Sequence, residues 1–169
     1  MNPVQIITDS CCDLPVSIRE QYGICTALMS YVIADKSYPD DTWMTQEPGQ
    51  FYRLMREGAV ATTSQVTANQ FVNLFREGLD SGHDILYIGF SSALSGTLNA
   101  ASLARNMVLQ ERPDAVIEIV DSLSASMGFG LLVLEAARLV KEGASLTTVR
   151  DWVENNKLRM NHWLTVGDL

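Results

Sequence analysis

Three serines, a glycine and a threonine fall within the seven residues from Ser91 to Thr97. This hydroxyl-rich turn directly follows a short apolar run at residues 85–90, which is typical of a buried parallel strand. From Leu98 onward, apolar residues recur at spacings of three and four and predict a helix. The start of a helix offers free backbone N–H groups and a positive dipole end, so the sequence predicts a place to bind an anion.

The same turn has a simpler interpretation, because serine and threonine are favoured at helix caps for local reasons alone. A single hydroxyl here would indicate only a cap. Gly96 would let an anion approach the backbone closely. An anion site is favoured over a plain cap because four hydroxyls gather in one turn: Ser91, Ser92, Ser95 and Thr97.

Composition and charge restrict the classes of function. The chain has 169 residues, of which 47% are apolar and 19% charged, so it can bury a sizeable core. Its net charge of −8 offers no basic face for nucleic acid. Without a long apolar run or a basic leader, we expect no membrane span and a cytoplasmic location.

The cysteines do not suggest a disulfide framework. Their number is odd and two of them are adjacent. We expect small buried or half-buried side chains rather than metal ligands at Cys11, Cys12 and Cys25.

Polar residues also follow two other predicted strands. Residues 4–8 lead to Asp9 and Ser10, and residues 115–120 lead to Asp121. The carboxyl ends of parallel strands meet at one edge, where open α/β sheets bind their ligands. An aspartate there is more often a structural cap than a catalyst, and we expect that role for Asp9.

The intervening chain alternates between strand and helix patterns. Residues 24–33 form a long strand-like run that enters a hairpin-like excursion with an acidic end, Asp40 and Asp41. Further helices are expected after Pro48, after a cap at Thr67 and after a cap at Ser145, with a hydroxyl-rich loop over residues 59–65. A glycine-interrupted apolar helix is expected over residues 125–140, and a new strand over residues 163–166. This alternation predicts an α/β fold, a doubly wound, mostly parallel sheet with helices on both faces.

The polar groups at this sheet edge suit holding an anion better than transforming one. No nucleophile elbow, GxGxxG motif or P-loop is present, and no histidine, lysine or arginine stands ready as a base. Two alternatives remain open. One is a metal-dependent phosphotransferase or hydrolase that uses Asp9 and Asp121; the other is a plain interaction module.

The sequence resembles the DegV family of bacterial fatty-acid-binding proteins. The matching motifs run through the whole chain in the family's order: IITDS at residues 6–10, DLP at 13–15, TSQ at 63–65, SSALSGT at 91–97 and VDS at 120–122. The resemblance implies residues 1–158 as a first, lipid-binding domain and residues 159–169 as the start of a truncated second domain.

In that family a long-chain fatty acid is enclosed between the two domains. The resemblance implies that Thr63 and Ser95 hydrogen-bond its carboxylate. Members present the carboxylate to a separate fatty acid kinase and are not enzymes themselves, and the resemblance implies no cofactor or metal beyond the bound lipid. The supporting residues that it implies are Ser64, Ser92, Gly96, Thr97, Asp9 and Ser10.

Two further expectations concern apolar surface. Residues 127–132 either border the acyl tunnel or pack a helix against the sheet, and the sequence does not separate these alternatives. A first domain alone would expose the apolar wall that a second domain covers. We therefore expect the chain to self-associate and to bind fatty acid more weakly than a full-length relative.

Overall fold

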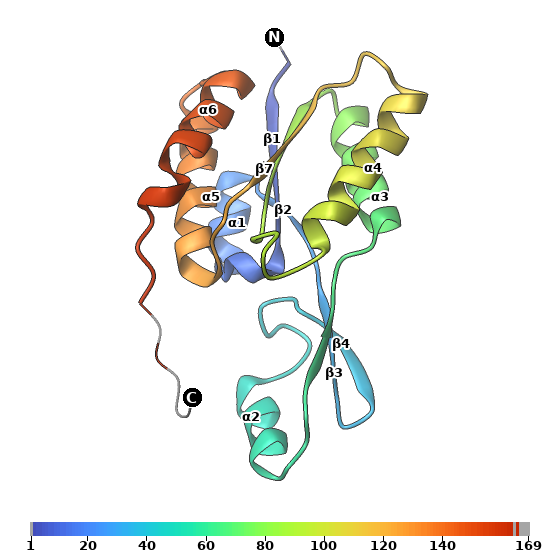
Figure 1. The fold of residues 1–169 in the computed structure, drawn as a ribbon, viewed down its shortest axis with the longest axis vertical. Helices are drawn as coiled ribbons and strands as arrows, with labels where there is room; N and C mark the ends of the chain where they lie inside the picture. The colour runs from blue at the N-terminus through green and yellow to red at the C-terminus, as the bar shows by residue number, and fades with distance from the viewer. Residues whose placement is uncertain (1, 164, 166–169) are drawn as a thin grey trace.

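The computed structural model describes residues 2–163 and 165. Its main layer is a parallel sheet with the strand order β2-β1-β6-β7, formed by Cys25–Ala27, Val4–Asp9, Asp84–Gly89 and Ile117–Asp121. Helices cover both faces of this sheet (Figure 1). The predicted doubly wound α/β fold is confirmed.

Each face of the sheet has its own core, because alternate residues of a strand point to opposite sides. On one face, Ile6 and Leu86 pack against α5 (Ser126–Lys141) and α6 (Leu146–Asn156). On the other, Ile7 and Tyr87 pack against α3 (Ala68–Asp80) and α4 (Thr97–Glu111). Burial on both faces explains why the strands are apolar runs rather than alternating ones. The short helix α1 (Val16–Tyr22) lies on the α5 side.

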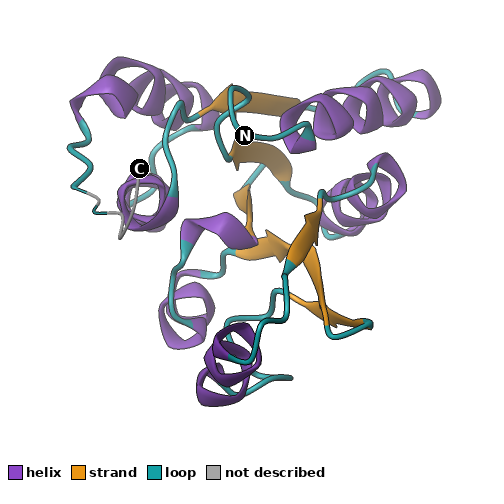
Figure 2. Cartoon of the chain, turned by 60° about the horizontal axis from the view of Figure 1, so that its bottom comes forward, coloured by secondary structure: helices purple, strands orange, loops and turns teal. Residues whose placement is uncertain are grey.

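A second, antiparallel sheet projects beyond the carboxyl edge of the first (Figures 1 and 2). Its strand order is β4-β3-β5, formed by Lys36–Pro39, Ser30–Ile33 and Thr62–Ser64, and it carries α2 (Pro48–Arg56). The turn between β3 and β4 places Ala34 and Asp35 at positive φ, the geometry of a two-residue type I′ hairpin. The predicted hairpin excursion is therefore confirmed.

Two local predictions were wrong. Residues 24–33 are not one strand: the chain leaves the main sheet after Ala27 and enters the second sheet at Ser30. Residues 62–64, expected within a loop, form β5 and pair with β3. The first error arises because a local sequence pattern does not show that one apolar run is divided between two sheets. The second arises because residues 62–64 become a strand only through long-range pairing with β3. The predicted strand that begins at Trp163 includes Leu164 and Val166, which lie outside the described residues.

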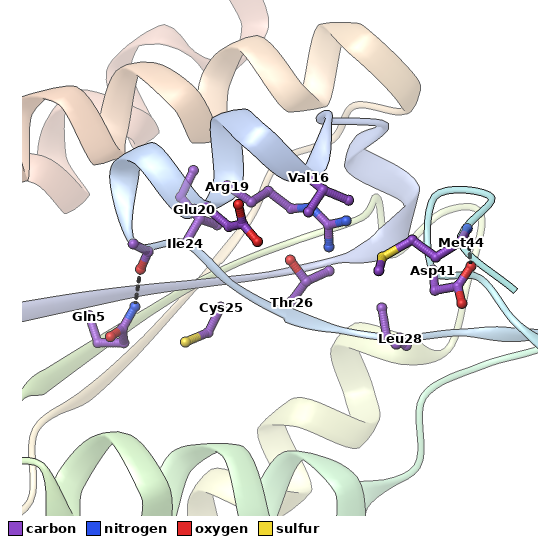
Figure 3. Close-up of a pocket in the computed structure, with 11 residues that line it drawn as sticks. Gln5, Val16, Arg19, Glu20, Ile24, Cys25, Thr26, Leu28, Asp41 and Met44 are labelled. Carbon is purple, nitrogen blue, oxygen red and sulfur yellow. Dashed lines mark hydrogen bonds between the residues drawn. The ribbon is translucent and has the colours of Figure 1, made fainter.

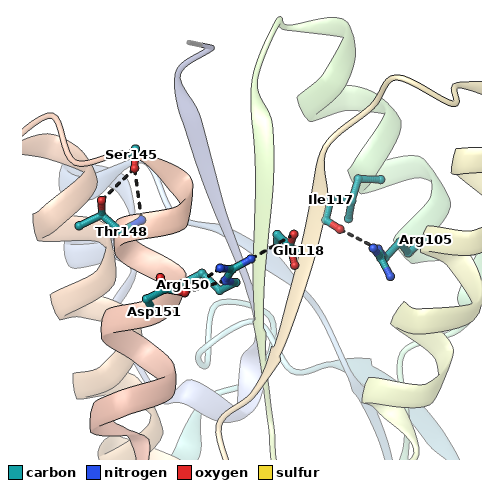
Figure 4. A network of polar contacts seen from close by, with 7 residues as sticks. All are labelled: Arg105, Ile117, Glu118, Ser145, Thr148, Arg150 and Asp151. Carbon is teal, nitrogen blue, oxygen red and sulfur yellow. Dashed lines mark hydrogen bonds and ion pairs between the residues drawn. The ribbon is translucent and has the colours of Figure 1, made fainter.

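The last strand of the main sheet is fastened from both faces (Figure 4). From α4, Arg105 donates through Nε to the carbonyl of Ile117 at 2.7 Å. From α6, Arg150 lies 3.5 Å from Glu118 and also pairs with Asp151. The predicted cap of α6 is present, since Ser145 Oγ accepts from the Thr148 N–H. The Arg105 and Arg150 contacts tie β7, an edge strand, to the helices on both faces of the sheet.

A buried carboxylate joins the ends of β1 and β6. Asp9 accepts hydrogen bonds from the Tyr87 hydroxyl and the Phe90 N–H, each at 2.8 Å, and from the Cys11 N–H at 3.2 Å. That last contact caps the short 3₁₀ turn η1 (Ser10–Cys12). Burial raises the pKa of Asp9 above its usual 3.8, while the hydrogen bonds oppose the shift. The expected role of Asp9 as a structural cap agrees with this geometry.

Helix α5 packs directly onto η1 at a glycine. A Cβ at Gly130 would lie 2.2 Å from the backbone carbonyl oxygen of Cys12. In the same helix, Phe129 and Leu132 are buried, whereas Met127 and Leu131 are exposed. The buried face of residues 127–132 therefore packs against the core, and the exposed face lies free of it.

We predict that Gly130→Ala lowers the free energy of unfolding by about 2 kcal/mol, because the backbone of η1 cannot move aside for a methyl group. Gly128→Ala in the same helix is the matched control: the three atoms nearest to its Cβ belong to the ring of His162, an exposed side chain that can rotate away. Alanine should there be neutral or stabilising by up to about 1 kcal/mol. Urea unfolding measures both, and equal effects would contradict the packing argument.

The raised pKa of Asp9 predicts a pH dependence of stability. A carboxyl group that binds its proton more tightly when folded favours folding below its unfolded pKa, and this contribution is lost as the pH rises through the folded pKa. The difference in unfolding free energy between the wild type and Asp9→Asn should therefore fall as the pH rises above about 4, with a limiting slope of about 1.4 kcal/mol per pH unit. Urea unfolding between pH 4 and pH 8 measures it.

Asp114→Asn provides the control, because Asp114 is exposed in a turn. Its difference from the wild type should stay nearly level over the same range. A difference for Asp9→Asn that stays level or increases with pH would refute the assignment of a raised pKa.

Candidate functional site

The hydroxyl-rich turn after β6 is a compact, internally bonded loop. The carbonyl of Ser91 accepts from the N–H groups of Leu94 and Ser95, and its hydroxyl accepts from the Ala93 N–H. The Ser91 N–H in turn donates to the carbonyl of Ser124. Ser91 is buried, so its role is to shape the turn rather than to meet a ligand.

Ser95 and Thr97 stand at the start of α4, as predicted. Ser95 Oγ accepts from the Thr97 N–H at 3.2 Å and lies 3.0 Å from Thr97 Oγ1. Thr97 is fully buried, whereas Ser95 is half-buried. When the Thr97 hydroxyl donates to Ser95, the Ser95 O–H remains free to donate to a ligand.

Thr63 and Ser95 line the same open groove, although they come from β5 and from the loop before α4. The groove has a volume of about 570 Å³. Gln65 and Gly96 meet within it, and a Cβ at Gly96 would lie 2.3 Å from Gln65 Oε1. Glycine at position 96 therefore permits the close approach of the Gln65 amide to the helix start. Four side chains complete the lining: Cys11, Met29, Phe90 and Leu94.

The groove adjoins a mostly apolar pocket of about 190 Å³ to which α2 contributes Phe51. The pocket shares Cys11, Met29 and Thr63 with the groove, and its other lining residues are Ser30, Tyr31, Asp40 and Ala61. Cys11 Sγ lies 3.0 Å from Met29 Sδ at the boundary between them. A polar head-group region thus opens directly onto an apolar one.

The position of the groove follows from the order of the strands. The chain runs from β1 outward to β2, and later from β6 outward to β7, so β1 and β6 are neighbours at which the winding changes direction. Loops that leave such neighbouring strands diverge and open a crevice at the carboxyl edge. Cys11 follows β1 and Ser95 follows β6, and both line the groove.

The remaining predicted supporting residues do not line this groove. Ser10 is buried and accepts from the Met29 N–H, which fixes the connection to the second sheet. Ser92 bonds through its N–H and its hydroxyl to Asp121, and Asp121 also accepts from the Leu123 N–H. Ser64 is exposed on β5, opposite Ser30. These residues shape the loops around the groove.

Asp9 and Asp121, the two aspartates of the alternative metal hypothesis, lie at the ends of β1 and β7 with β6 between them. Each carboxylate accepts hydrogen bonds from nearby N–H and O–H groups and fastens loops. Over residues 2–163 and 165, no cluster of three or more histidine, cysteine or acidic side chains has the geometry to hold a metal ion. In this structure both aspartates stabilise the loops at the carboxyl edge of the sheet.

The cysteines agree with the sequence expectation only in part. Cys12 is buried and Cys11 half-buried, but Cys25 is exposed on the edge strand β2. Burial, with the nearby Asp9 carboxylate, raises the pKa of the Cys11 thiol to about 12. The Cys11 thiol, which lines the groove, therefore stays protonated near neutral pH and is not a nucleophile.

Several groove residues escaped prediction from the sequence. Gln65 lies in the TSQ motif, and that motif was the available signal for it. No motif indicated Cys11 or Met29. Cys11 lines the groove because it follows β1, and Met29 lines it because the chain passes there into the second sheet. At the same edge, Leu94 is 67% exposed and Leu123 is 48% exposed.

None of the helices in the described part of the chain is long and apolar enough to cross a membrane. This finding leaves the predicted location of the protein untested.

Relatives of this chain are found by sequence and by structure. A protein of Clostridium perfringens named as a DegV domain-containing protein is 41% identical over 169 residues, which are all of this chain and 58% of that protein. A solved structure from Thermus thermophilus is titled as fatty acid binding of a DegV family protein. It is 33% identical to this chain with a TM-score of 0.82, and the match covers 94% of this chain and 54% of the solved chain.

A Thermotoga maritima structure, whose title says that it reveals fatty acid binding function, is 31% identical with a TM-score of 0.78. It covers 92% of this chain, and the match spans 55% of the solved chain. The chain therefore spans little more than half the length of these relatives. Residues 3–169 match the family described as "Uncharacterised protein, DegV family". The chain belongs to the DegV family.

Proposed function

We propose that this chain binds a long-chain fatty acid and holds its carboxylate in the groove between Thr63 and Ser95. The observation that carries the proposal is that Thr63, from the second sheet, and Ser95, from the loop before α4, line one groove. Relatives at 31% and 33% identity are described as fatty-acid-binding proteins, which supports the same ligand.

The chemistry of the groove suits a carboxylate. When the Thr97 hydroxyl donates to Ser95 Oγ, the Ser95 O–H is free to donate to a carboxylate. Helix α4 adds the positive end of its dipole. Hydrogen bonds to a charged group are shorter and stronger than neutral ones, and they offset the cost of moving a carboxylate out of water. No lysine or arginine lines the groove in the part of the chain that is described, so hydroxyl and amide groups carry the recognition.

The apolar pocket supplies a place for methylene groups. It adjoins the hydroxyl groove at Thr63, Cys11 and Met29, so an acyl chain leaving the head-group region meets apolar side chains at once. Each buried methylene contributes about 0.8 kcal/mol. A pocket of about 190 Å³ is too small for a complete long acyl chain. We propose that the rest of the acyl chain is enclosed by the second domain that the longer family members have.

We further propose that the bound carboxylate is presented to a separate fatty acid kinase. The groove is open to solvent, so a phosphoryl donor held by another protein can reach a carboxylate within it. This chain then acts as an acyl carrier, with the transfer catalysed by its partner.

Removal of the two hydroxyls tests the head-group site. Ser95→Ala and Thr63→Val should each weaken palmitate binding about tenfold, since a hydrogen bond to a charged group contributes about 1.5–3 kcal/mol and the groove is partly open to water. Isothermal titration calorimetry with palmitate measures this. Thr147→Val is the matched control, because Thr147 is exposed on α6. Unchanged palmitate affinity in a variant that carries both Ser95→Ala and Thr63→Val would refute the assignment of the two residues.

Phosphoryl transfer tests the carrier role. The palmitate-loaded chain, mixed with Mg-ATP and a bacterial fatty acid kinase, should yield acyl phosphate, detected as the hydroxamate after trapping with hydroxylamine. The chain and Mg-ATP without the kinase should yield none. Product formed without the kinase would show that this chain is itself an enzyme, and none formed with several kinases would contradict presentation.

A further inference from the structure

Residues 30–64, which comprise the antiparallel sheet and α2, have an apolar core of their own and are called the outer unit below. Tyr31 stacks on Tyr38 with 5.5 Å between the ring centroids, and Phe51 of α2 meets Tyr31 edge-on at 5.4 Å. Gln46 is buried and accepts from the Tyr31 hydroxyl at 2.6 Å. These contacts tie the helix and the sheet into one body.

The outer unit is joined to the main layer by a narrow connection. The buried core clusters of the described residues reach Met29 and Val66 but include no residue between them. The Met29 N–H donates to Ser10 Oγ, and Val66 is fully buried, so both ends of the connection are fixed to the main layer. From there two paired segments leave side by side, because Ser30 lies opposite Ser64. Two bodies that share no core and are joined by two strands can rotate about the joint.

Open grooves lie on both sides of this connection. The hydroxyl groove, of about 570 Å³, is lined by Met29 and by Thr63 of the outer unit. A second groove, of about 580 Å³, runs along α1 and the edge strand β2, and it is lined by Leu28 and by Met44 of the outer unit (Figure 3). Because the consecutive residues Leu28 and Met29 face different grooves, the connection separates the two. Rotation of the outer unit toward α1 therefore narrows the α1 groove and widens the hydroxyl groove.

Within residues 2–163 and 165, one side-chain hydrogen bond joins the outer unit to the main layer. Arg19 of α1 donates to Thr42 Oγ1 at 2.8 Å. Thr42 and Trp43 both have positive φ, 63° and 68°, which costs free energy for residues with branched or bulky side chains. Asp41 stabilises this turn by accepting from two N–H groups that follow it. The turn thereby holds the Thr42 hydroxyl next to Arg19.

We propose that Arg19 is a positioning residue, whose hydrogen bond to Thr42 holds the outer unit toward α1 and keeps the hydroxyl groove wide. When this bond breaks, the outer unit rotates about residues 29–30 and 64–65, and Thr63 approaches Ser95. The rotation does not depend on any ligand, whereas its effect on a fatty acid rests on the function proposed above. A ligand held by both walls favours the narrow groove, so its binding and the Arg19–Thr42 hydrogen bond oppose each other.

Residual dipolar couplings of the ¹⁵N-labelled chain measure the orientation of residues 30–64 relative to the main sheet. Thr42→Val keeps the branched shape but removes the acceptor, whereas Thr42→Ser keeps the hydroxyl and is the matched control. Thr42→Val and Arg19→Met should each rotate the outer unit toward the start of α4, and Thr42→Ser should keep the wild-type orientation. The double variant should rotate it no further than either single variant, because both remove the same bond.

Couplings within the main sheet that fit the wild-type structure show that each variant is folded. An orientation that is unchanged in both Thr42→Val and Arg19→Met, or a rotation toward α1, would overturn the proposal.

The release of palmitate to fatty-acid-free albumin tests the effect on the hydroxyl groove. Release should be about fivefold slower from Thr42→Val than from the wild type, since a partly exposed hydrogen bond from a charged donor shifts a two-state equilibrium by about this factor. Release from Thr42→Ser should be unchanged. Rotation without a change in the release rate would overturn the link between Arg19 and the groove. A wild type that does not bind palmitate would contradict the proposed function instead, and the dipolar couplings would still decide whether the outer unit rotates.

Discussion

The carboxyl edge of the main sheet depends on one buried carboxylate. Asp9 accepts from a side chain of β6, from the backbone just after β6 and from the turn after β1, so it fixes the two loops that diverge at this edge. Its burial makes ionisation costly, and the three donors compensate for part of that cost. The loop that carries Ser95 and the turn that carries Cys11 leave the sheet from positions that this interaction sets.

The second sheet supplies one wall of the groove, and the carboxyl edge of the main sheet supplies the other. A doubly wound sheet supplies a helix start with hydroxyls at its edge, but it provides no opposite wall. Here the chain leaves the sheet after Ala27, forms the antiparallel excursion and returns through Thr63 and Gln65 to the fully buried Val66. The groove is thus the space between a parallel layer and a small antiparallel one.

The fold was predictable where local pattern and burial agree. The run at residues 85–90 and the caps at Thr67 and Ser145 appear as expected, because strand burial and helix capping act over a few residues. The division of residues 24–33 between two sheets was not predictable, since both halves are apolar and only long-range pairing separates them. Their motifs made Thr63 and Ser95 candidate site residues, and in the structure both line one groove. Met29 joins this groove through tertiary geometry alone, since the chain passes there into the second sheet.

The strand order of the small sheet has a consequence for how the family can vary in sequence. Thr63 pairs across from Tyr31 on β3, while β4 lies on the far side of β3. The hairpin tip at Ala34 and Asp35 can therefore lengthen, shorten or acquire new residues without shifting the hydroxyl of Thr63. A single deletion between Ser64 and the cap at Thr67 would instead rotate that hydroxyl to the opposite face of its strand. Natural insertions should thus accumulate at the tip, while the length of the return segment stays constant.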